Sequence, residues 1–164
     1  MPARIFHLAI SNGGAPKQAI REGVVGEVGI VGDRQKHTKI HGGPLRALCL
    51  YSLELIEKLQ AEGHPIYPGS VGENVTISGL PWATLGSGTR LALGDEVVIE
   101  LTTEATPCKN IGPSFLGKEF KRLWAPGEMR WYCKVLEPGV LRVAQPVRDL
   151  TANPRSGQLD FEIG

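Results

Sequence analysis

Cys108 is the residue of this chain whose type and setting best suit chemistry. It lies in T-E-A-T-P-C-K-N-I-G, residues 103–112, which follow an apolar strand pattern. Pro107 has no N–H to donate to a neighbouring strand, so the strand should end before it and Cys108 should begin a loop. Lys109 follows directly, and a nearby cation favours the reactive thiolate form. The setting indicates a functional cysteine, with an ordinary loop cysteine as the alternative.

The other two cysteines are expected to be ordinary buried thiols. Cys49 lies within L-R-A-L-C-L-Y, and Cys133 lies within W-Y-C-K-V. Both stretches are apolar, and a free cysteine in such a setting behaves as a small hydrophobic side chain. An odd number of cysteines also makes a disulfide framework an unlikely basis for the fold.

A second candidate for chemistry is a basic loop at residues 32–44. This loop and its flank are rich in cations and imidazoles, with Asp33 as the nearest acid: Arg34, Lys36, His37, Lys39, His41 and Arg46. Glycines at 32, 42 and 43 would let the backbone approach a ligand closely. Arginine can grip a phosphate or carboxylate through two hydrogen bonds. The loop is therefore either an anion pocket or a solvated turn.

Other metal and nucleotide motifs are weak or absent in the sequence. His37 and His41 are four residues apart, but no glutamate occupies position 38, and Gly42-Gly43-Pro44 would break a helix that aligned them. The sequence contains no C-x-x-C, no phosphate-binding G-x-x-x-x-G-K-[ST] and no G-x-S-x-G.

The composition is that of one globular domain. The chain has 164 residues, 21 glycines, 12 prolines and a net charge of +1. So small a net charge argues against broad attachment to nucleic acid or to a membrane surface. The N-terminus lacks the apolar core of a signal peptide, and no apolar run is long enough to span a bilayer. We therefore expect a cytoplasmic protein with reduced thiols.

Short strands separated by turns dominate the predicted secondary structure. We expect strands over 3–11, 23–31, 45–51 and 72–79, a pair over 89–102, and a hairpin formed by 130–136 and 139–145. Ser52 should cap a helix over 53–62, and Ser114 should cap a second one over 114–124. With seven to nine strands, two helices and no regular βαβ alternation, the sequence predicts a mainly β, barrel-like domain with a few helices.

Several motifs, taken in order, resemble the MOSC domain, which is found at the C-terminus of molybdenum cofactor sulfurases. The motifs are G-D-R (32–34), H-G-G-P (41–44), A-L-C-L-Y-S (47–52), G-E-N-V-T (72–76), G-D (94–95), P-C (107–108) and R-W-Y-C-K-V-L-E-P-G (130–139). The stand-alone bacterial branch is the most similar. The resemblance places a MOSC domain at residues 1–145 and leaves 146–164 as a tail that packs on the barrel or trails from it.

The resemblance implies a compact β barrel-like fold and a role for the cysteine of the P-C motif, Cys108. In some relatives that cysteine binds the molybdenum of the pyranopterin cofactor, and in others it is proposed to carry sulfur. Molybdenum cofactor would then be held by residues of the basic loop and its neighbours: Arg34, His41, Gly42, Arg46, Asn74, Lys109 and Arg130. Thiolate suits a soft metal centre, and arginine suits the cofactor's phosphate.

Three functions follow from this resemblance and remain open at the level of sequence. The first is a molybdenum-cofactor reductase of N-hydroxylated small molecules, which would need an electron-donor protein because the chain has no flavin, haem or iron–sulfur motif. The second is a sulfur carrier that receives a persulfide on Cys108 from a sulfur donor. The third is a non-catalytic module that binds a pterin or another anion.

Overall fold

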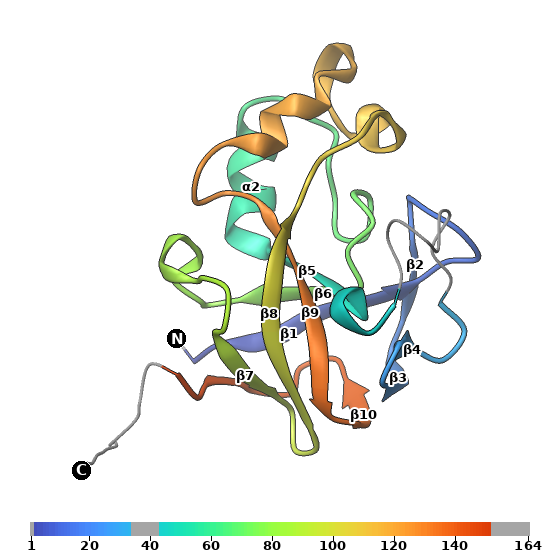
Figure 1. Ribbon diagram of the computed structural model, residues 1–164. Helices are drawn as coiled ribbons and strands as arrows, with labels where there is room; N and C mark the ends of the chain where they lie inside the picture. The colour runs from blue at the N-terminus through green and yellow to red at the C-terminus, as the bar shows by residue number, and fades with distance from the viewer. Residues whose placement is uncertain (1, 34–42, 152–164) are drawn as a thin grey trace.

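The computed structural model describes residues 2–33 and 43–151 (Figure 1). These residues form eleven strands, one α-helix and five short 3-10 helices. The strands are β1 (Arg4–Ile10), β2 (Gln18–Ile20), β3 (Glu22–Gly26), β4 (Gly29–Ile30), β5 (Leu48–Ser52), β6 (Val75–Ser78), β7 (Arg90–Leu93), β8 (Val97–Ala105), β9 (Arg130–Glu137), β10 (Gly139–Arg142) and β11 (Val147–Asp149). The helices are α2 (Leu53–Ala61), η1 (Pro44–Arg46), η2 (Trp82–Thr84), η3 (Lys109–Ser114), η4 (Leu116–Lys118) and η5 (Phe120–Trp124).

Eight of the strands form one strongly bent sheet. Its order is β11-β7-β8-β9-β5-β6-β1-β2, and a second sheet has the order β10-β3-β4. The far ends of the large sheet approach each other, and two hydrogen bonds join the chain around β11 to the chain around β1. The N–H of Ile5 donates to the carbonyl oxygen of Gln145 at 2.8 Å, and the N–H of Val147 donates to that of Ala3 at 2.9 Å. The prediction of a mainly β, barrel-like domain with a few helices is confirmed, although the strands outnumber the predicted seven to nine.

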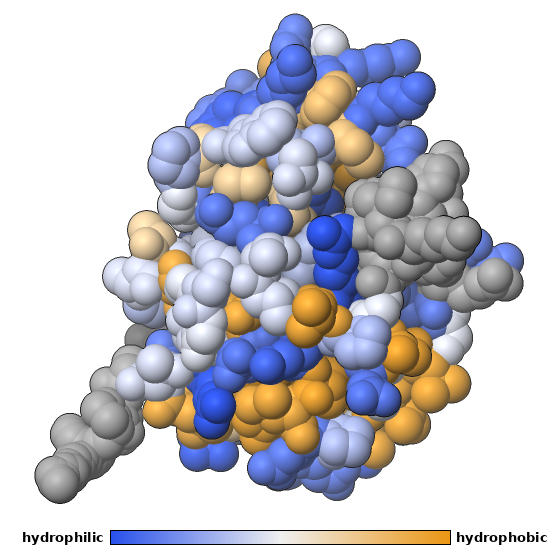
Figure 2. Space-filling view, in the orientation of Figure 1, coloured by the Kyte–Doolittle hydropathy of each residue, from blue (hydrophilic) through white to orange (hydrophobic). Residues whose placement is uncertain are grey.

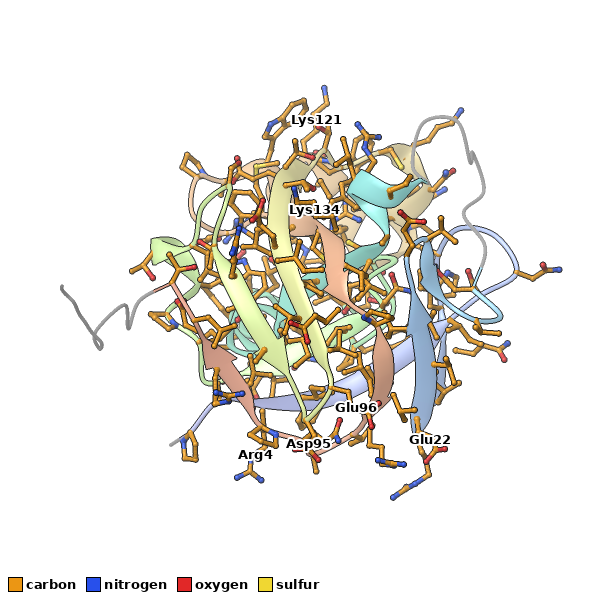
Figure 3. All side chains as sticks on the ribbon, turned by 60° about the horizontal axis from the view of Figure 1, so that its bottom comes forward. Arg4, Glu22, Asp95, Glu96, Lys121 and Lys134 are labelled. Atoms are coloured by element: carbon orange, nitrogen blue, oxygen red, sulfur yellow. The ribbon has the colours of Figure 1, made fainter. Side chains whose placement is uncertain are left out.

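The hydrophobic core fills the inside of the bent sheet. The central strand β5 is buried along its whole length, as the apolar run at 45–51 predicted. On β8 the burial alternates, so that Val97, Ile99 and Leu101 point inward. Figure 3 shows charged side chains pointing away from the body of the domain, with Glu22 and Glu96 at the strand ends and Lys134 on an outer face.

The helix predicted over 53–62 is confirmed as α2. Ser52 caps it, since its Oγ accepts a hydrogen bond from the N–H of Leu55 at 3.1 Å. Ile56 and Leu59 are its buried residues. Gly63 closes the helix with a φ of +100°, a conformation that favours glycine. The strands on either side of α2, β5 and β6, are parallel neighbours in the large sheet, so this part of the chain is a single βαβ unit.

The α-helix predicted over 114–124 is wrong. The chain there forms short 3-10 turns, η3 to η5, and φ is positive at both Gly117 and Lys118. Two successive residues in the left-handed region interrupt any continuous helix. Ser114 does not cap a helix, because its hydroxyl donates to the carbonyl oxygen of Ser70 at 3.1 Å.

Two strand predictions also need correction. Residues 23–31 form two antiparallel strands, β3 and β4, because Gly29 has a φ of +124° and turns the chain back after Gly26. The hairpin predicted for 130–136 and 139–145 is absent, since β10 pairs with β3. The reason is that β9 lies between β5 and β8, so both of its edges are occupied.

Large apolar side chains gather on part of the surface. Figure 2 shows apolar surface on the lower part of the molecule, where the small sheet lies. Val24, Val28 and Val31 of this region are 53%, 69% and 72% exposed. No helix in the described part of the chain is long and apolar enough to cross a membrane.

Candidate functional site

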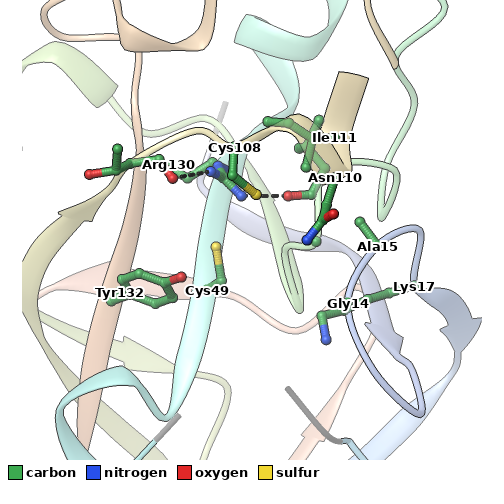
Figure 4. Close-up of a pocket in the computed structure, with 12 residues that line it drawn as sticks. Gly14, Ala15, Lys17, Cys49, Cys108, Asn110, Ile111, Arg130 and Tyr132 are labelled. Atoms are coloured by element: carbon green, nitrogen blue, oxygen red, sulfur yellow. Dashed lines mark hydrogen bonds between the residues drawn. The ribbon is translucent and has the colours of Figure 1, made fainter. Parts of the chain in front are cut away.

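A pocket with a volume of about 50 Å³ lies where five separate segments meet (Figure 4). The segments are the loop before β2, strand β5, the turn before β6, the stretch between β8 and η3, and strand β9. The lining residues are Gly14, Ala15, Lys17, Cys49, Val71, Gly72, Thr106, Cys108, Asn110, Ile111, Arg130 and Tyr132. A volume of this size accommodates a few water molecules or one small polar group.

Cys108 lies half-buried in the pocket wall. Strand β8 ends at Ala105, before Pro107, as the missing proline N–H predicted. Cys108 then has extended backbone angles and precedes η3, and its carbonyl oxygen accepts a hydrogen bond from the N–H of Ile111 at 3.1 Å. The chain thus places a partly accessible thiol on a well-supported turn.

Arg130 is a buried cation that lines the same pocket as Cys108, and it is only 6% exposed. Its Nη1 donates to the carbonyl oxygen of Val71 at 2.6 Å, and its Nη2 donates to those of Ala105 at 3.4 Å and Thr106 at 3.3 Å. Its Nε–H is inaccessible to solvent and has no hydrogen-bond partner among the described residues. The guanidinium therefore ties β9 to two other pocket segments through neutral carbonyl groups.

Lys17 is the other buried cation of the pocket, and it has a carboxylate partner. Its Nζ lies 2.7 Å from Oδ1 of Asp33, with both side chains nearly inaccessible. Oδ2 of Asp33 accepts from Nδ2 of Asn74 at 3.0 Å, and Oδ1 of Asn74 accepts from the N–H of Cys49 at 3.0 Å. A continuous polar chain thus joins Lys17 to the strand that carries Cys49.

The structure separates the two cysteines that the sequence treated alike. Cys49 lines the pocket and packs with Ala105 and Tyr132, whereas Cys133 lies in the main core. Burial raises the pKa of Cys49 to about 11, against a smaller opposing effect of Arg130. Burial also raises the pKa of Cys133. Both thiols therefore stay protonated at neutral pH.

Tyr132 contributes an aromatic wall beside Cys49. Burial raises the pKa of its hydroxyl to about 12, so it stays neutral. Arg46, a predicted cofactor residue, lies over this ring with its Cζ 5.3 Å from the centroid. That distance permits a cation–π interaction. Arg46 supports the pocket wall from behind Tyr132 and is not among the residues that line the pocket.

The structure brings together only part of the predicted site. Cys108 and Arg130 share the pocket, whereas Lys109 is exposed and outside its lining. Asn74, predicted to hold the cofactor, is fully buried and is not among the residues that line the pocket, and its amide instead bonds to the N–H of Cys49 and to Asp33. Arg34, His41 and Gly42 lie outside the described residues.

Lys17, Cys49 and Tyr132 are pocket residues that sequence reasoning missed. The signal for Tyr132 was available in hindsight, because Arg130 and Tyr132 share one parity on a strand and Trp131 and Cys133 share the other. Nothing in the sequence around Lys17 indicated a pocket, since its partners come from distant segments.

The donor set is suited to a metal that arrives with ligands of its own. Across residues 2–33 and 43–151, no Asp, Glu or His lines the pocket, and no cluster of three or more His, Cys, Asp or Glu could hold a bare ion. The lining instead offers the accessible thiol of Cys108, the buried guanidinium of Arg130 and a glycine at position 72. Such a set offers a single soft ligand and a positive charge, which fits a metal–pterin group better than a free ion.

A single bent β domain with a thiol at the end of β8 defines the class to which this chain belongs. The MOSC domain family model matches residues 37–148, and the chain is a member of that family. The family is associated with the molybdenum cofactor. Membership was anticipated from the motifs, and it is confirmed.

Three curated relatives are similar in sequence. Protein YiiM of Escherichia coli is 28% identical over 126 residues, which is 74% of this chain and 56% of that protein. The uncharacterised protein YflK of Bacillus subtilis is 31% identical over 110 residues, which is 66% of this chain and 49% of that protein. A protein of Gibberella moniliformis named "Reductase" is 28% identical over 116 residues, which is 68% of this chain and 20% of that protein. The chain thus spans about half the length of the first two and a fifth of the third.

Solved structures share the fold. YiiM from Geobacillus stearothermophilus superposes with a TM-score of 0.71 at 20% identity, covering 91% of this chain and 75% of that one. The YUAD protein from Bacillus subtilis gives a TM-score of 0.72 at 20% identity, covering 90% of this chain and 94% of that one. At such identities the similarity is one of fold.

Proposed function

We propose that this protein binds molybdenum cofactor through the thiolate of Cys108 and reduces N-hydroxylated or N-oxygenated small molecules. The observation that carries the proposal is the position of Cys108, half-buried in a pocket wall beside a buried arginine, in a chain of the MOSC family. The similarity to a protein named as a reductase supports the reaction class.

Each pocket residue has a distinct task in this proposal. Cys108 supplies the thiolate ligand, and Arg130 places a positive charge beside it. Gly72 has a φ of +84°, and a side chain there would extend toward Ala15 and Arg130 and narrow the pocket. Arg34, His41 and Gly42 are the candidates to hold the rest of the cofactor.

The bound cofactor would supply the two-electron redox chemistry, and the chain's residues would bind, orient and shield the reacting groups. The reduction converts an N–OH group to N–H and water, and it consumes two electrons and two protons. A partner protein is the source of the electrons in this proposal. Cys49 and Tyr132, both protonated at neutral pH, form the inner wall against which a small substrate would lie.

The experiment is to measure molybdenum and pterin per chain after reconstitution with the mature cofactor. Wild type should retain close to one equivalent, Cys108→Ala should retain little, and Cys133→Ser should behave as wild type because its thiol is outside the pocket. The loaded protein should then reduce an N-hydroxylated substrate with a chemical reductant in place of the partner. Equal retention by wild type and Cys108→Ala would contradict the ligand role.

A sulfur carrier is the second candidate, and the partial exposure of Cys108 favours it independently of any cofactor. Retention of cofactor by neither wild type nor the variant would favour this function. Incubation with a sulfur donor should then place a persulfide on Cys108, whereas the better-buried Cys49 and Cys133 should remain unmodified.

A further inference from the structure

The part of the chain that the structure describes contains two buried cations, Lys17 and Arg130. Lys17 has Asp33 as its counter-ion at 2.7 Å. Among the described residues, Arg130 has no carboxylate within hydrogen-bonding or ion-pairing distance, and its partners there are three backbone carbonyl groups. A buried charge without a partner of opposite sign is costly, so proteins rarely keep one without a use for it.

The fully buried carboxyl group of Glu73 makes no ion pair with Arg130 in the described part of the chain, and its Oε1 has no hydrogen-bond partner there. Its Oε2 accepts from the N–H of Gly69 at 2.9 Å and from Oγ1 of Thr76 at 3.2 Å. Arg130 influences it only through space, and burial raises the pKa of Glu73, which favours its neutral form. The positive charge of Arg130 is therefore poorly balanced by the described residues.

The location of Arg130 makes this imbalance relevant to ligand binding. Its side chain lines the same small pocket as Cys108, and the lining contributed by residues 2–33 and 43–151 carries no acidic residue. The Nη1 of Arg130 makes one hydrogen bond within the described residues and lies beside the pocket wall, 3.9 Å from where a Cβ at Gly72 would stand, whereas the Nε without a partner is itself inaccessible to solvent. A volume of about 50 Å³ is large enough to admit a small anionic group.

We propose that Arg130 forms a subsite for a small carboxylate group next to the thiol of Cys108. A carboxylate accepts a strong charge-assisted hydrogen bond from a guanidinium, and it would supply the missing negative charge in a poorly solvated place. If the reductase proposed above is correct, on which this extension rests, the subsite selects N-oxygenated substrates that carry a carboxylate near the reacting nitrogen.

The subsite can be tested without cofactor by alkylating Cys108 with two reagents of similar shape. In each reaction the thiolate attacks the CH₂ carbon, a C–S bond forms, the C–I bond breaks and iodide leaves. Iodoacetate carries a carboxylate, and iodoacetamide does not. The ratio of their rate constants at Cys108, divided by the same ratio for N-acetylcysteine amide, isolates the effect of the carboxylate.

For wild type we expect this normalised ratio to be about tenfold above one, which corresponds to one charge-assisted hydrogen-bonded contact. Arg130→Met should bring it to about one, and Arg130→Lys should give an intermediate value because the charge stays but the fixed position of the guanidinium N–H is lost. Lys109→Gln is the matched control, since the side chain of Lys109 does not line the pocket and is exposed to solvent and salt. It should change the ratio less than twofold.

Peptide mapping by mass spectrometry assigns each adduct. Cys49 also lines the pocket, but with a pKa of about 11 it should react far more slowly than an accessible thiol at pH 8. Selective loss of the carboxylate effect in Arg130→Met would support the subsite. A wild-type ratio near one, or a raised ratio that persists in Arg130→Met, would overturn it.

A competition experiment on wild type keeps the test valid even if the Arg130 variants fail to fold. At constant ionic strength, formate and acetate should slow the alkylation of Cys108 by neutral iodoacetamide in a saturable way. Protection by sulfate or phosphate alone would overturn the carboxylate assignment, and no saturable protection by any anion would overturn the subsite. Neither result bears on cofactor retention by wild type, so the two proposals fail separately.

Discussion

The two buried cations of the pocket, Lys17 and Arg130, show that burial of a charge does not by itself mark a ligand site. Lys17 belongs to a polar chain that runs through Asp33 and Asn74 to the backbone of Cys49. Within the part of the chain that the structure describes, Arg130 bonds only to carbonyl groups. The first cation is balanced by the protein and holds segments together, whereas the second carries a charge that a ligand can balance. This difference can be tested by removing one group at a time.

The largest effect is expected from Asp33→Asn, which leaves Lys17 buried without its counter-ion. The free energy of unfolding should fall by about 3–5 kcal/mol, the cost of breaking a buried ion pair from one side. Urea denaturation measures the change.

Lys17→Met/Asp33→Asn is the control for that measurement, because it removes both charges. The double variant should be more stable than Asp33→Asn alone. Equal destabilisation in the two would mean that Lys17 is not the reason for the cost, and the contrast with Arg130 would lose its basis.

A smaller fall in the free energy of unfolding is expected when Cys49 ionises at high pH. Its pKa is about 11 in the folded protein and 9.0 for an ordinary thiol, because burial disfavours the thiolate. The folded state therefore holds this proton more tightly than the unfolded chain. The resulting stability is fully present below pH 9 and is lost as the pH rises toward 11, by about 2–3 kcal/mol.

Unfolding under reducing conditions at pH 8 and pH 10.5 would measure this loss, and Cys49→Ala should show a shallower decline than wild type. Arg130→Met should raise the pKa of Cys49 further, since Arg130 opposes the effect of burial. A pH profile identical in wild type and Cys49→Ala would contradict the burial of this thiol.

The smallest change in stability is expected from Arg130→Met. The variant leaves carbonyl oxygens of Val71, Ala105 and Thr106 without a donor, which is unfavourable, but it also removes an unbalanced charge. We expect the free energy of unfolding to fall by no more than about 2 kcal/mol. A loss as large as that of Asp33→Asn would indicate that the protein balances Arg130 by itself.

The candidate site was only partly predictable because its residues come from both local and distant relationships. Cys108 was identifiable because Pro107 is its neighbour and ends the strand. Lys17 was not identifiable as a pocket residue, since its position depends on Asp33 and, through it, on Asn74, which lie 16 and 57 residues further along the chain. The exposed Lys109 shows the reverse error, in which closeness in sequence suggested a pocket residue that lies outside the lining.

Cys49 and Cys133, which lie on the paired strands β5 and β9, also show that local sequence alone does not identify the pocket residues. Both lie in apolar stretches, and local sequence gives them one description. The register of β5 against β9 sets Cys49 opposite Tyr132 and Leu48 opposite Cys133. Because adjacent residues of a strand face opposite sides, this register sends Cys49 to the pocket and Cys133 to the core.

The sequence by itself determined the features that depend on a few neighbouring residues. These are the short strands, the helix capped by Ser52, the end of β8 before Pro107 and the family to which the chain belongs. The tertiary structure alone decided which edges β9 had free, and hence that β10 pairs with β3. It also decided which buried cation has a counter-ion. These outcomes depend on strand register and on contacts between distant segments, and no local pattern of residue types encodes them.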